Sequence, residues 1–351
     1  MLYPLKFKSV YKDYIWGGRG LEKLGKKLPE GIVAESWEIS SHPDGESKVL
    51  SGEYKDISIS ELTKIFGKDL IGSELDKKDL EKFPLLIKLI DANDKLSVQV
   101  HPEDEYAKVH ENGELGKNEM WYIVSAKPGA KIVYGVSKGV TKEIFQAAVK
   151  ADKVETCLNH LEVFAGDTVN IPAGMLHAIG DGIVIAEIQQ NSNTTYRVFD
   201  YNRTDAKGIK RPLHIEKALE VIDFNNCNIQ GKQEGIQVKL EKNSSKHFLL
   251  ANEYFSVEKY SIAGKIQEQA DGSRFCTYTC LQGEGEIVYS GGTVKLKLGE
   301  SILIPASLGS YTIEGHLELI KAYVPNIKAN VIEPLLRAGY NSEEIYLKVI
   351  G

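Results

Sequence analysis

Short alternating or apolar runs, separated by Gly, Asp, Asn and Pro, make up most of this 351-residue chain. Such a pattern is typical of an antiparallel β-sandwich or barrel. The alternation is clearest in SVQVHP, residues 97–102, where two valines alternate with Ser97, Gln99 and His101. Because successive side chains of a strand point to opposite faces, one face of this strand is apolar. The other face carries a hydroxyl, an amide and an imidazole.

Helical periodicity is confined to three stretches, at residues 58–72, 139–162 and 214–223. Ser58 or Ser60 can cap the first helix, and Thr141 can cap the second. The pattern therefore predicts helical insertions near 58–80 and 141–160 in a chain that is otherwise β.

The chain carries a related unit twice. AGDTVNIPAGMLHAI (165–179) aligns without a gap with LGESILIPASLGSYT (298–312), and AKIVYG (130–135) resembles GEIVYS (285–290). The AKIVYG segment lies 155 residues before its counterpart, whereas the AGDTVNIPAGMLHAI segment lies 133 residues before its own. The stretch between the two segments is therefore about 22 residues longer in the first copy. This surplus matches the second helical stretch, which we interpret as a helix inserted into the first copy alone.

Composition and charge narrow the possible partners. With 42% hydrophobic residues the chain can bury a large core, and its net charge of −6 comes from interspersed acids and bases. Without a basic stripe we expect no nucleic-acid partner. The most apolar run, FPLLIKLI, is interrupted by Lys88, and no signal peptide is recognisable, so we expect a cytoplasmic protein without membrane contact. Four cysteines without a CxxC pair are interpreted as reduced, buried thiols, and the sequence leaves a monomer or a homodimer open.

Residues 166–177 fit the pattern GxxxxxPxGxxH, with Gly166, Pro172, Gly174 and His177 at the fixed positions. The segment resembles the second motif of the cupin superfamily, in which a Pro and Gly turn delivers a histidine into a small β-barrel. Asp181 stands where that motif often has Asn.

SVQVHP, followed by Glu119 in GKNEMWYI, resembles the first cupin motif with Gln99 in place of one histidine. Two imidazoles, one carboxylate and one amide oxygen, with room for water, make an open metal site. The predicted ligands are Gln99, His101, Glu119 and His177. Imidazoles with one carboxylate suit zinc, and the ligand types leave manganese and iron as alternatives.

The second copy lacks this set. The gap-free alignment gives Ser310 at the position of His177, and the upstream alignment gives Arg274 at the position of Glu119. We therefore expect a mainly β fold of two cupin-type barrels (jelly rolls) with a few inserted helices. Residues 1–235 form the predicted metal-binding catalytic domain and 236–351 a degenerate second cupin domain without metal ligands. A polar linker at 225–235 joins them.

The ordered motifs YIWGG, AESWEIS, SVQVHP, GKNEMWYI, PAGMLHAI and EIQQNSNTTYRVFDYNR together resemble a type I phosphomannose isomerase of the short bacterial form. This resemblance implies an isomerase that interconverts mannose 6-phosphate and fructose 6-phosphate with one zinc ion per chain, held by the four predicted ligands. It maps the family's active-site arginine onto Arg197, its lysine onto Lys117 and a serine onto Ser97. Asn193 stands where relatives commonly have Asp, so that carboxylate has no role here.

Aldose–ketose isomerisation moves a proton between neighbouring carbons through an enediolate, whose charge a bound zinc ion stabilises. Arg197 and Lys117 can anchor the phosphate of a small sugar phosphate or the developing oxyanion. The proton carrier stays open among Glu187, a zinc-bound water or hydroxide, and Lys117.

Two other functions are compatible with a cupin. A metal-dependent oxygenase has a similar metal face, but such sites are usually richer in histidine. A non-catalytic sugar-binding or regulatory double cupin is the other alternative, and four ligands concentrated in one barrel argue against it.

Overall fold

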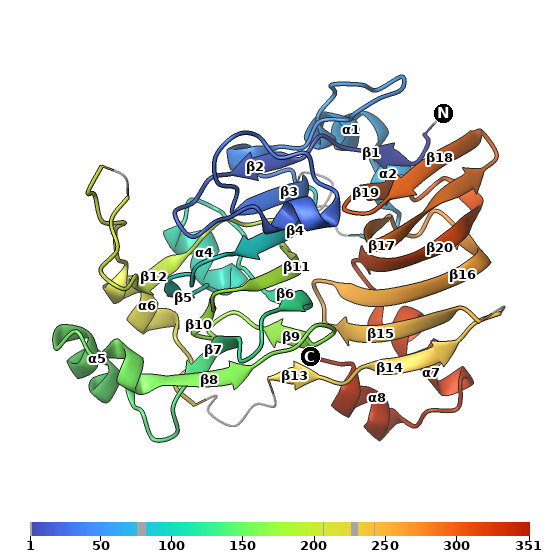
Figure 1. The fold of residues 1–351 in the computed structure, drawn as a ribbon. Helices are drawn as coiled ribbons and strands as arrows, with labels where there is room; N and C mark the ends of the chain where they lie inside the picture. The colour runs from blue at the N-terminus through green and yellow to red at the C-terminus, as the bar shows by residue number, and fades with distance from the viewer. Residues whose placement is uncertain (1, 76–81, 206, 226–230, 242) are drawn as a thin grey trace.

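The strands of this computed structural model form three antiparallel sheets, which Figure 1 shows as two β units side by side. The structure describes residues 2–75, 82–205, 207–225, 231–241 and 243–351. The seven-stranded sheet runs in the order β13 (Lys232–Gln233), β9 (Thr168–Ile171), β6 (Glu119–Ala126), β11 (Ile183–Gln190), β4 (Leu85–Ala92), β3 (Glu35–Ile39) and β2 (Val10–Lys12). The five-stranded sheet contains β12 (Tyr196–Phe199), β5 (Val98–Val100), β10 (His177–Ile179), β7 (Lys131–Val136) and β8 (Leu158–Glu162).

These two sheets enclose the core of the first unit. Ile90 and Ile185 of the seven-stranded sheet and Ile132 and Ile179 of the five-stranded sheet belong to one buried cluster. The outer face of the five-stranded sheet is covered by α5 (Lys142–Lys150) and α6 (Ile215–Val221), whose apolar residues share a second cluster with the valines of β5. The two valines of SVQVHP thus pack against these helices, and its alternate polar residues face the barrel interior.

The second unit is built on an eight-stranded sheet with three long strands. Its order is β1 (Leu5–Lys6), β19 (Ser301–Ile304), β17 (Cys276–Tyr289), β20 (Gly309–Tyr323), β16 (Ser256–Ala270), β15 (Ser245–Ala251) and β14 (Ile236–Lys239), with β18 (Gly292–Lys297) paired to β17. A separate buried cluster fills this unit and includes Tyr260, Tyr278 and Tyr311. A mainly β fold is confirmed.

The two units share a core. Residues of β4, β6 and β11 on the outer face of the seven-stranded sheet cluster with residues of β15, β16 and β20 and with helices α1 (Ile59–Phe66) and α2 (Lys68–Ile71). The backbone N–H of Ala306 donates to the carbonyl of Leu70 at 3.0 Å. The chain's N-terminal strand also crosses over, because Leu5 of β1 pairs with Leu303 of β19. The division at residue 235 stays a prediction.

The strand pairing repeats between the units, as the internal repeat predicts. In the first unit β11 lies between β4 and β6, and β6 also pairs with β9; in the second, β20 lies between β16 and β17, and β17 also pairs with β19. The connection between β7 and β8 holds α5 and a 3₁₀ turn (Val154–Cys157), whereas residues 290–291 join β17 to β18. The insertion therefore belongs to the first unit alone.

The helical insertions are shorter than the sequence predicts. Ser58 caps α1 in a capping box with Glu61, and α1 and α2 end at Ile71, while residues 76–81 lie outside the described part. Thr141 caps α5, but this helix ends at Lys150, because Asp152 takes a left-handed conformation with φ of 55°. The prediction of helix up to residue 160 was therefore wrong, since residues 158–162 form β8.

The remaining helices lie at the ends of sheets. They are α4 (Asp104–His110), α7 (Glu333–Arg337) and α8 (Ser342–Lys348), with 3₁₀ turns at Gly20–Leu24 and Pro43–Gly45 and a π-helical turn at Lys328–Ile332. The predicted linker includes β13, which pairs with β9, and its residues 226–230 lie outside the described part. Cys157, Cys276 and Cys280 are buried free thiols, and Cys227 is not among the described residues. Among the helices described, none is long and apolar enough to span a bilayer.

Candidate metal centre and active-site pocket

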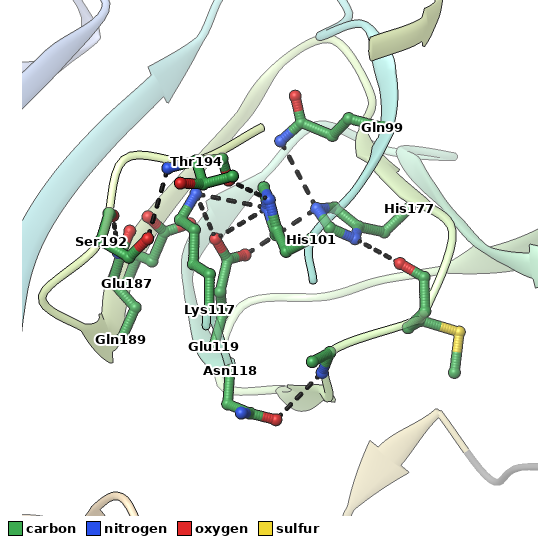
Figure 2. Close-up of polar contacts among 12 residues, drawn as sticks. Gln99, His101, Lys117, Asn118, Glu119, His177, Glu187, Gln189, Ser192 and Thr194 are labelled. Carbon is green, nitrogen blue, oxygen red and sulfur yellow. Dashed lines mark hydrogen bonds and ion pairs between the residues drawn. The ribbon is translucent and has the colours of Figure 1, made fainter. Parts of the chain in front are cut away.

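Three of the predicted metal ligands converge inside the first barrel (Figure 2). His101 follows β5, Glu119 begins β6 and His177 begins β10. All three side chains are buried, and one ligand atom of each lies within 4.8 Å of the others. The fourth, Gln99, pairs in register with His177 across β5 and β10. The four residues that the motifs single out are therefore neighbours in space.

The turn before β10 positions His177. Gly174 has φ of 83°, which is costly for a residue with a Cβ atom, and its N–H donates to the carbonyl of His101 at 2.9 Å. The Asn118 side-chain oxygen accepts a hydrogen bond from the Ala173 N–H at 2.9 Å. These two contacts tie the Pro and Gly turn to both strands that carry the other ligands.

The two imidazoles present the same nitrogen to the carboxylate. His101 Nε2 lies 3.2 Å from Glu119 Oε1, and His177 Nε2 lies 3.9 Å from Glu119 Oε2. On the opposite side of each ring, Nδ1 donates to a backbone carbonyl at 2.8 Å, that of Thr194 for His101 and that of Met175 for His177. Such contacts fix the tautomer and leave the Nε2 lone pairs free for a metal ion.

The electrostatics of this cluster favour neutral histidines and an ionised carboxylate. Burial, with the nearby charge of Lys117, lowers the pKa of His101 to about 3, and burial lowers the pKa of His177 as well. Burial opposes ionisation of Glu119, but Lys117 and the histidines more than offset it and hold its pKa well below the usual value. Neutral imidazole and carboxylate are the protonation states in which these groups bind metal.

Glu119 and Gln99 show how an ion fits. Among the residues described, Glu119 Oε1 finds no well-aligned hydrogen-bond donor, although Lys117 Nζ lies 2.8 Å away. The Gln99 amide nitrogen lies 3.4 Å from His177 Nε2, and its oxygen faces Ser97 Oγ at 3.4 Å. A flip of this amide by about 180° exchanges its nitrogen and oxygen, so that the oxygen faces the histidines. The donor set of two imidazoles, one carboxylate and one amide oxygen thus suits a divalent ion.

Lys117 lies inside the ligand cluster. Its Nζ is 2.8 Å from Glu119 Oε1 and 3.2 Å from His101 Nε2, and its side chain is 4% exposed. The backbone N–H of Lys117 donates to the carbonyl of Pro102 at 3.0 Å, which joins the start of β6 to the end of β5. Its ammonium group is therefore a fixed positive charge at the metal centre.

Glu187 lies next to the ligand cluster on β11. Trp121 Nε1 donates to Glu187 Oε2 at 2.9 Å and to Glu119 Oε2 at 3.1 Å, so one indole links the two carboxylates. Lys88 Nζ donates to Glu187 Oε1 at 2.9 Å and lies 3.8 Å from Glu35 Oε2. Burial and the negative charge of Glu119 raise the pKa of Glu187.

Arg197 and Ser97 lie at the edge of the same pocket. Arg197 Nε donates to Ser97 Oγ at 3.1 Å, and its Nη1 donates to the Pro212 carbonyl at 2.9 Å. The neighbouring carboxylate of Asp200 forms ion pairs with Arg203 and Arg211. Within the described part of the chain no carboxylate forms an ion pair with Arg197, so its charge is available to an anion.

The pocket has a volume of about 250 Å³ and is lined by Ser97, Gln99, Lys117, His177, Glu187 and Arg197, together with Asn193. Sequence reasoning missed six of its charged or aromatic members, namely Tyr14, Trp16, Glu35, Lys88, Trp121 and Arg211. Arg211 follows a loop, and Lys88 interrupts an apolar run. Glu35 and Trp121 lie in AESWEIS and GKNEMWYI, two of the motifs already singled out, which is the signal that could have found them.

The register of the second barrel corrects the gap-free alignment of its active-site positions. His177 pairs with Gln99 in the first barrel, and Tyr311 pairs with Glu268 in the second. Tyr311 lies one residue farther from Ile304 than His177 lies from the equivalent Ile171, so HAI aligns with YTI and Ser310 falls outside the site. Ser310 was therefore the wrong counterpart of His177.

Arg274 was likewise the wrong counterpart of Glu119. Glu119 pairs with Ile171, and Cys276 pairs with the equivalent Ile304. Arg274 lies before β17 and forms an ion pair with Glu74 at 2.7 Å. Cys276 therefore occupies the position of Glu119.

Known protein families and curated proteins resemble this chain over most of its length. The family model for the catalytic domain of phosphomannose isomerase type I matches residues 4–119, and that for the cupin domain of mannose-6-phosphate isomerase matches residues 244–324. Mannose-6-phosphate isomerase ManA of Bacillus subtilis is 37% identical over 321 residues, which is 92% of this chain and 99% of that protein. A mannose-6-phosphate isomerase of Streptococcus mutans is 36% identical over 332 residues, with coverage of 92% and 99%.

Solved structures extend the comparison to the fold. The crystal structure of the mannose 6-phosphate isomerase from Bacillus subtilis superposes with a TM-score of 0.83 at 34% identity, covering 92% of this chain and 99% of that one. A variant of phosphomannose isomerase from Salmonella typhimurium has a TM-score of 0.72 at 15% identity, covering 92% and 100%, and shares the fold.

Proposed function

This chain belongs to the type I phosphomannose isomerase family and is an isomerase, and from that premise we propose that it interconverts mannose 6-phosphate and fructose 6-phosphate. We propose further that one zinc ion binds to Gln99, His101, Glu119 and His177. The buried cluster of two Nε2 atoms around a carboxylate, inside a pocket edged by an unpaired arginine, carries this proposal.

A zinc ion bound there would supply a Lewis acid for the oxygens on the first two carbons of the sugar. Lys117, 2.8 Å from Glu119 and with its side chain 4% exposed, adds a fixed positive charge where the enediolate becomes negative. Because Lys117 is held by buried contacts, its ammonium group needs little rearrangement during the reaction.

We assign the proton transfer between carbons to Glu187. Its carboxylate takes the proton from C2 of the aldose, which leaves an enediolate. The hydroxyl proton on O2 passes to O1, and Glu187 returns the carbon-bound proton to C1 to give the ketose. The raised pKa of Glu187, caused by burial and by Glu119, matches a group that must both accept and release a proton. The contacts from Lys88 and Trp121 keep this carboxylate facing the pocket.

Arg197 and Arg211 suit the phosphate end of the substrate. Burial lowers the pKa of Arg197, and so does the neighbouring charge of Arg211. Arg197 and Arg211 line the same pocket, so a dianion bound between them would stabilise both charges. Arginine recognises phosphate through paired N–H groups. Ser97 holds the Arg197 guanidinium by its hydroxyl at 3.1 Å.

Family membership argues against an oxygenase and against a purely binding protein. A cytoplasmic location and a monomeric or homodimeric state stay predictions, and a small sugar phosphate is the expected ligand.

The decisive experiment is a coupled assay of mannose 6-phosphate against fructose 6-phosphate, with and without a chelator, alongside metal analysis of the purified protein. We expect conversion that chelation abolishes and that added zinc restores. His101→Ala should lose both the metal and the activity. Conversion that is indifferent to chelation and to His101→Ala would overturn the proposal, and bound iron with oxygen uptake would support the oxygenase instead.

A further inference from the structure

The second barrel contains a pocket of its own, of about 200 Å³, at the position of the active-site pocket in the first barrel. Its wall includes Cys276 and Tyr311, which occupy the positions of Glu119 and His177. Three strands contribute charged side chains to this pocket, and the π-helical turn at 328–332 contributes Ala329 and Asn330. The charged and polar groups of the wall include Lys246, Glu258, Asp271, Arg274, Lys321 and Tyr323.

Most polar groups beneath this pocket are already paired. Lys321 Nζ donates to Glu268 Oε2 at 2.8 Å, and Tyr260 OH donates to Glu268 Oε1 at 3.0 Å. The hydroxyls of Tyr278 and Tyr311 lie 2.9 Å apart. A buried network satisfied in this way is rigid, so it fixes the floor of the pocket.

Two atoms of the pocket wall are not satisfied. Glu258 is 2% exposed, and its Oε1 accepts a hydrogen bond from Tyr323 at 2.8 Å. Its Oε2 has no hydrogen-bond donor among the described residues, with Lys246 Nζ at 3.5 Å as its nearest charge. Arg274 Nε is likewise buried without an acceptor in the described part of the chain. Both groups have an oppositely charged neighbour, Lys246 for Glu258 and Glu74 for Arg274. Burying a polar atom without a hydrogen bond is nevertheless costly, so Glu258 Oε2 and Arg274 Nε point to a missing hydrogen-bond partner.

The chemistry of that partner follows from the pocket's mixed charges. Three cations, Lys246, Arg274 and Lys321, line it together with two carboxylates, Glu258 and Asp271. A phosphate would meet the carboxylates, and a simple cation would meet the ammonium and guanidinium groups. A hydroxyl group both donates and accepts, so a ligand with several hydroxyls can bond to Glu258 Oε2 and Arg274 Nε together.

Cys276 argues against a second metal site. Burial raises the pKa of its thiol, whereas thiol ligands bind metal as thiolates. The pocket is also somewhat smaller than the 250 Å³ of the active-site pocket. If the active site holds a hexose phosphate, as proposed above, a sugar without its phosphate matches the smaller volume.

We propose that the second barrel binds a small neutral polyhydroxylated ligand of monosaccharide size, held by Glu258, Arg274 and the tyrosine-lined wall. The binding site is separate from the active site. Its carboxylates disfavour anions, and its ammonium and guanidinium groups disfavour cations, so that a neutral hydroxylated ligand is selected over both.

The test is a calorimetric titration of the metal-loaded full chain with D-mannose, D-fructose and glycerol. The titration is repeated on Arg197→Ala, in which the active site contributes less to the binding heat. We expect at least one of the three compounds to bind both the wild type and Arg197→Ala, and we expect inorganic phosphate not to compete with it. Glu258→Gln should weaken binding about tenfold, because it removes a charged hydrogen-bond acceptor. Ala329→Trp, which fills the pocket mouth from an exposed position, should abolish binding.

Glu314→Gln is the matched control, because Glu314 lies on β20 outside this pocket, paired with Lys265 at 2.9 Å. The control should bind like the wild type. No binding of any of the three compounds, unchanged binding in both pocket variants, or displacement by phosphate would overturn the proposal. Turnover of mannose 6-phosphate by Ala329→Trp, measured in parallel, separates this outcome from a failure of the proposed isomerase function.

Discussion

Replacing Lys88 by methionine tests the buried charge network beneath the active site. Lys88 is 3% exposed, with its Nζ 2.9 Å from Glu187 Oε1 and 3.8 Å from Glu35 Oε2. Methionine keeps most of the length and apolar contact of the side chain but removes its charge. The variant therefore leaves two buried carboxylates without their common cation.

The magnitude follows from these distances. At an effective dielectric constant of about 20, the attractions of Lys88 to Glu187 and Glu35 amount to about 6 and 4 kcal/mol. Methionine avoids the desolvation of the ammonium group, which offsets part of that sum. Breaking a buried ion pair from one side typically costs about 3–5 kcal/mol, and we expect a loss of this size in the free energy of unfolding.

The loss should depend on pH. Glu187 already has a raised pKa through burial and Glu119, and removing Lys88 raises it further. An acid whose pKa is higher in the folded state destabilises the fold increasingly as pH rises from its unfolded pKa to its folded pKa, and the penalty disappears below the unfolded pKa. The deficit of Lys88→Met should therefore shrink as pH falls from neutral toward the unfolded pKa of glutamate, about 4.3.

Guanidinium unfolding followed by tryptophan fluorescence measures the effect, with Lys88→Met/Glu187→Gln as the matched control. The double variant removes one charge of each sign and should recover part of the lost stability. A single variant as stable as the wild type near neutral pH, or a double variant no better than the single one, would refute the reasoning.

Three further predictions concern single residues. Trp121→Phe removes the N–H that orients Glu119 and Glu187, and chelator competition should show metal affinity lowered about 10- to 100-fold; unchanged affinity would contradict a positioning role. Glu187→Gln should keep its metal by elemental analysis but lose turnover, and wild-type activity would remove Glu187 as proton carrier. Ser58→Ala removes the capping box that Ser58 forms with Glu61, so thermal unfolding should show a loss of about 1 kcal/mol, whereas no change would mean that α1 contributes nothing to the transition.

The predicted ligands could be read from the sequence because each is fixed by local geometry. Strand alternation sets the direction of Gln99 and His101, and the Pro and Gly turn sets that of His177. Glu119 begins β6, the next strand along the chain, and follows from the same motif. All of these signals act within a few residues along the chain.

The other parts of the site depend on contacts between distant segments. Lys88 looks like a break in an apolar run, and only the pairing of β4 with β11 brings it to Glu187. A gap-free alignment cannot detect that the spacing from Ile304 to Tyr311 is one residue longer than the spacing from Ile171 to His177. Tyr311 and Cys276 therefore emerge as the counterparts of His177 and Glu119 only from strand register.

The pairing of β1 with β19 also constrains the order in which the chain folds during synthesis. Most strands of the first barrel have their partners within residues 35–233, so this barrel can form while the rest is being translated. Leu5 and Lys6 must wait for Ile302 and Leu303, which leave the ribosome about 300 residues later. Contacts between residues so far apart in sequence form late. Strand β1 is thus synthesised before the strands of the first unit, yet it is paired only after they can already have formed their barrel.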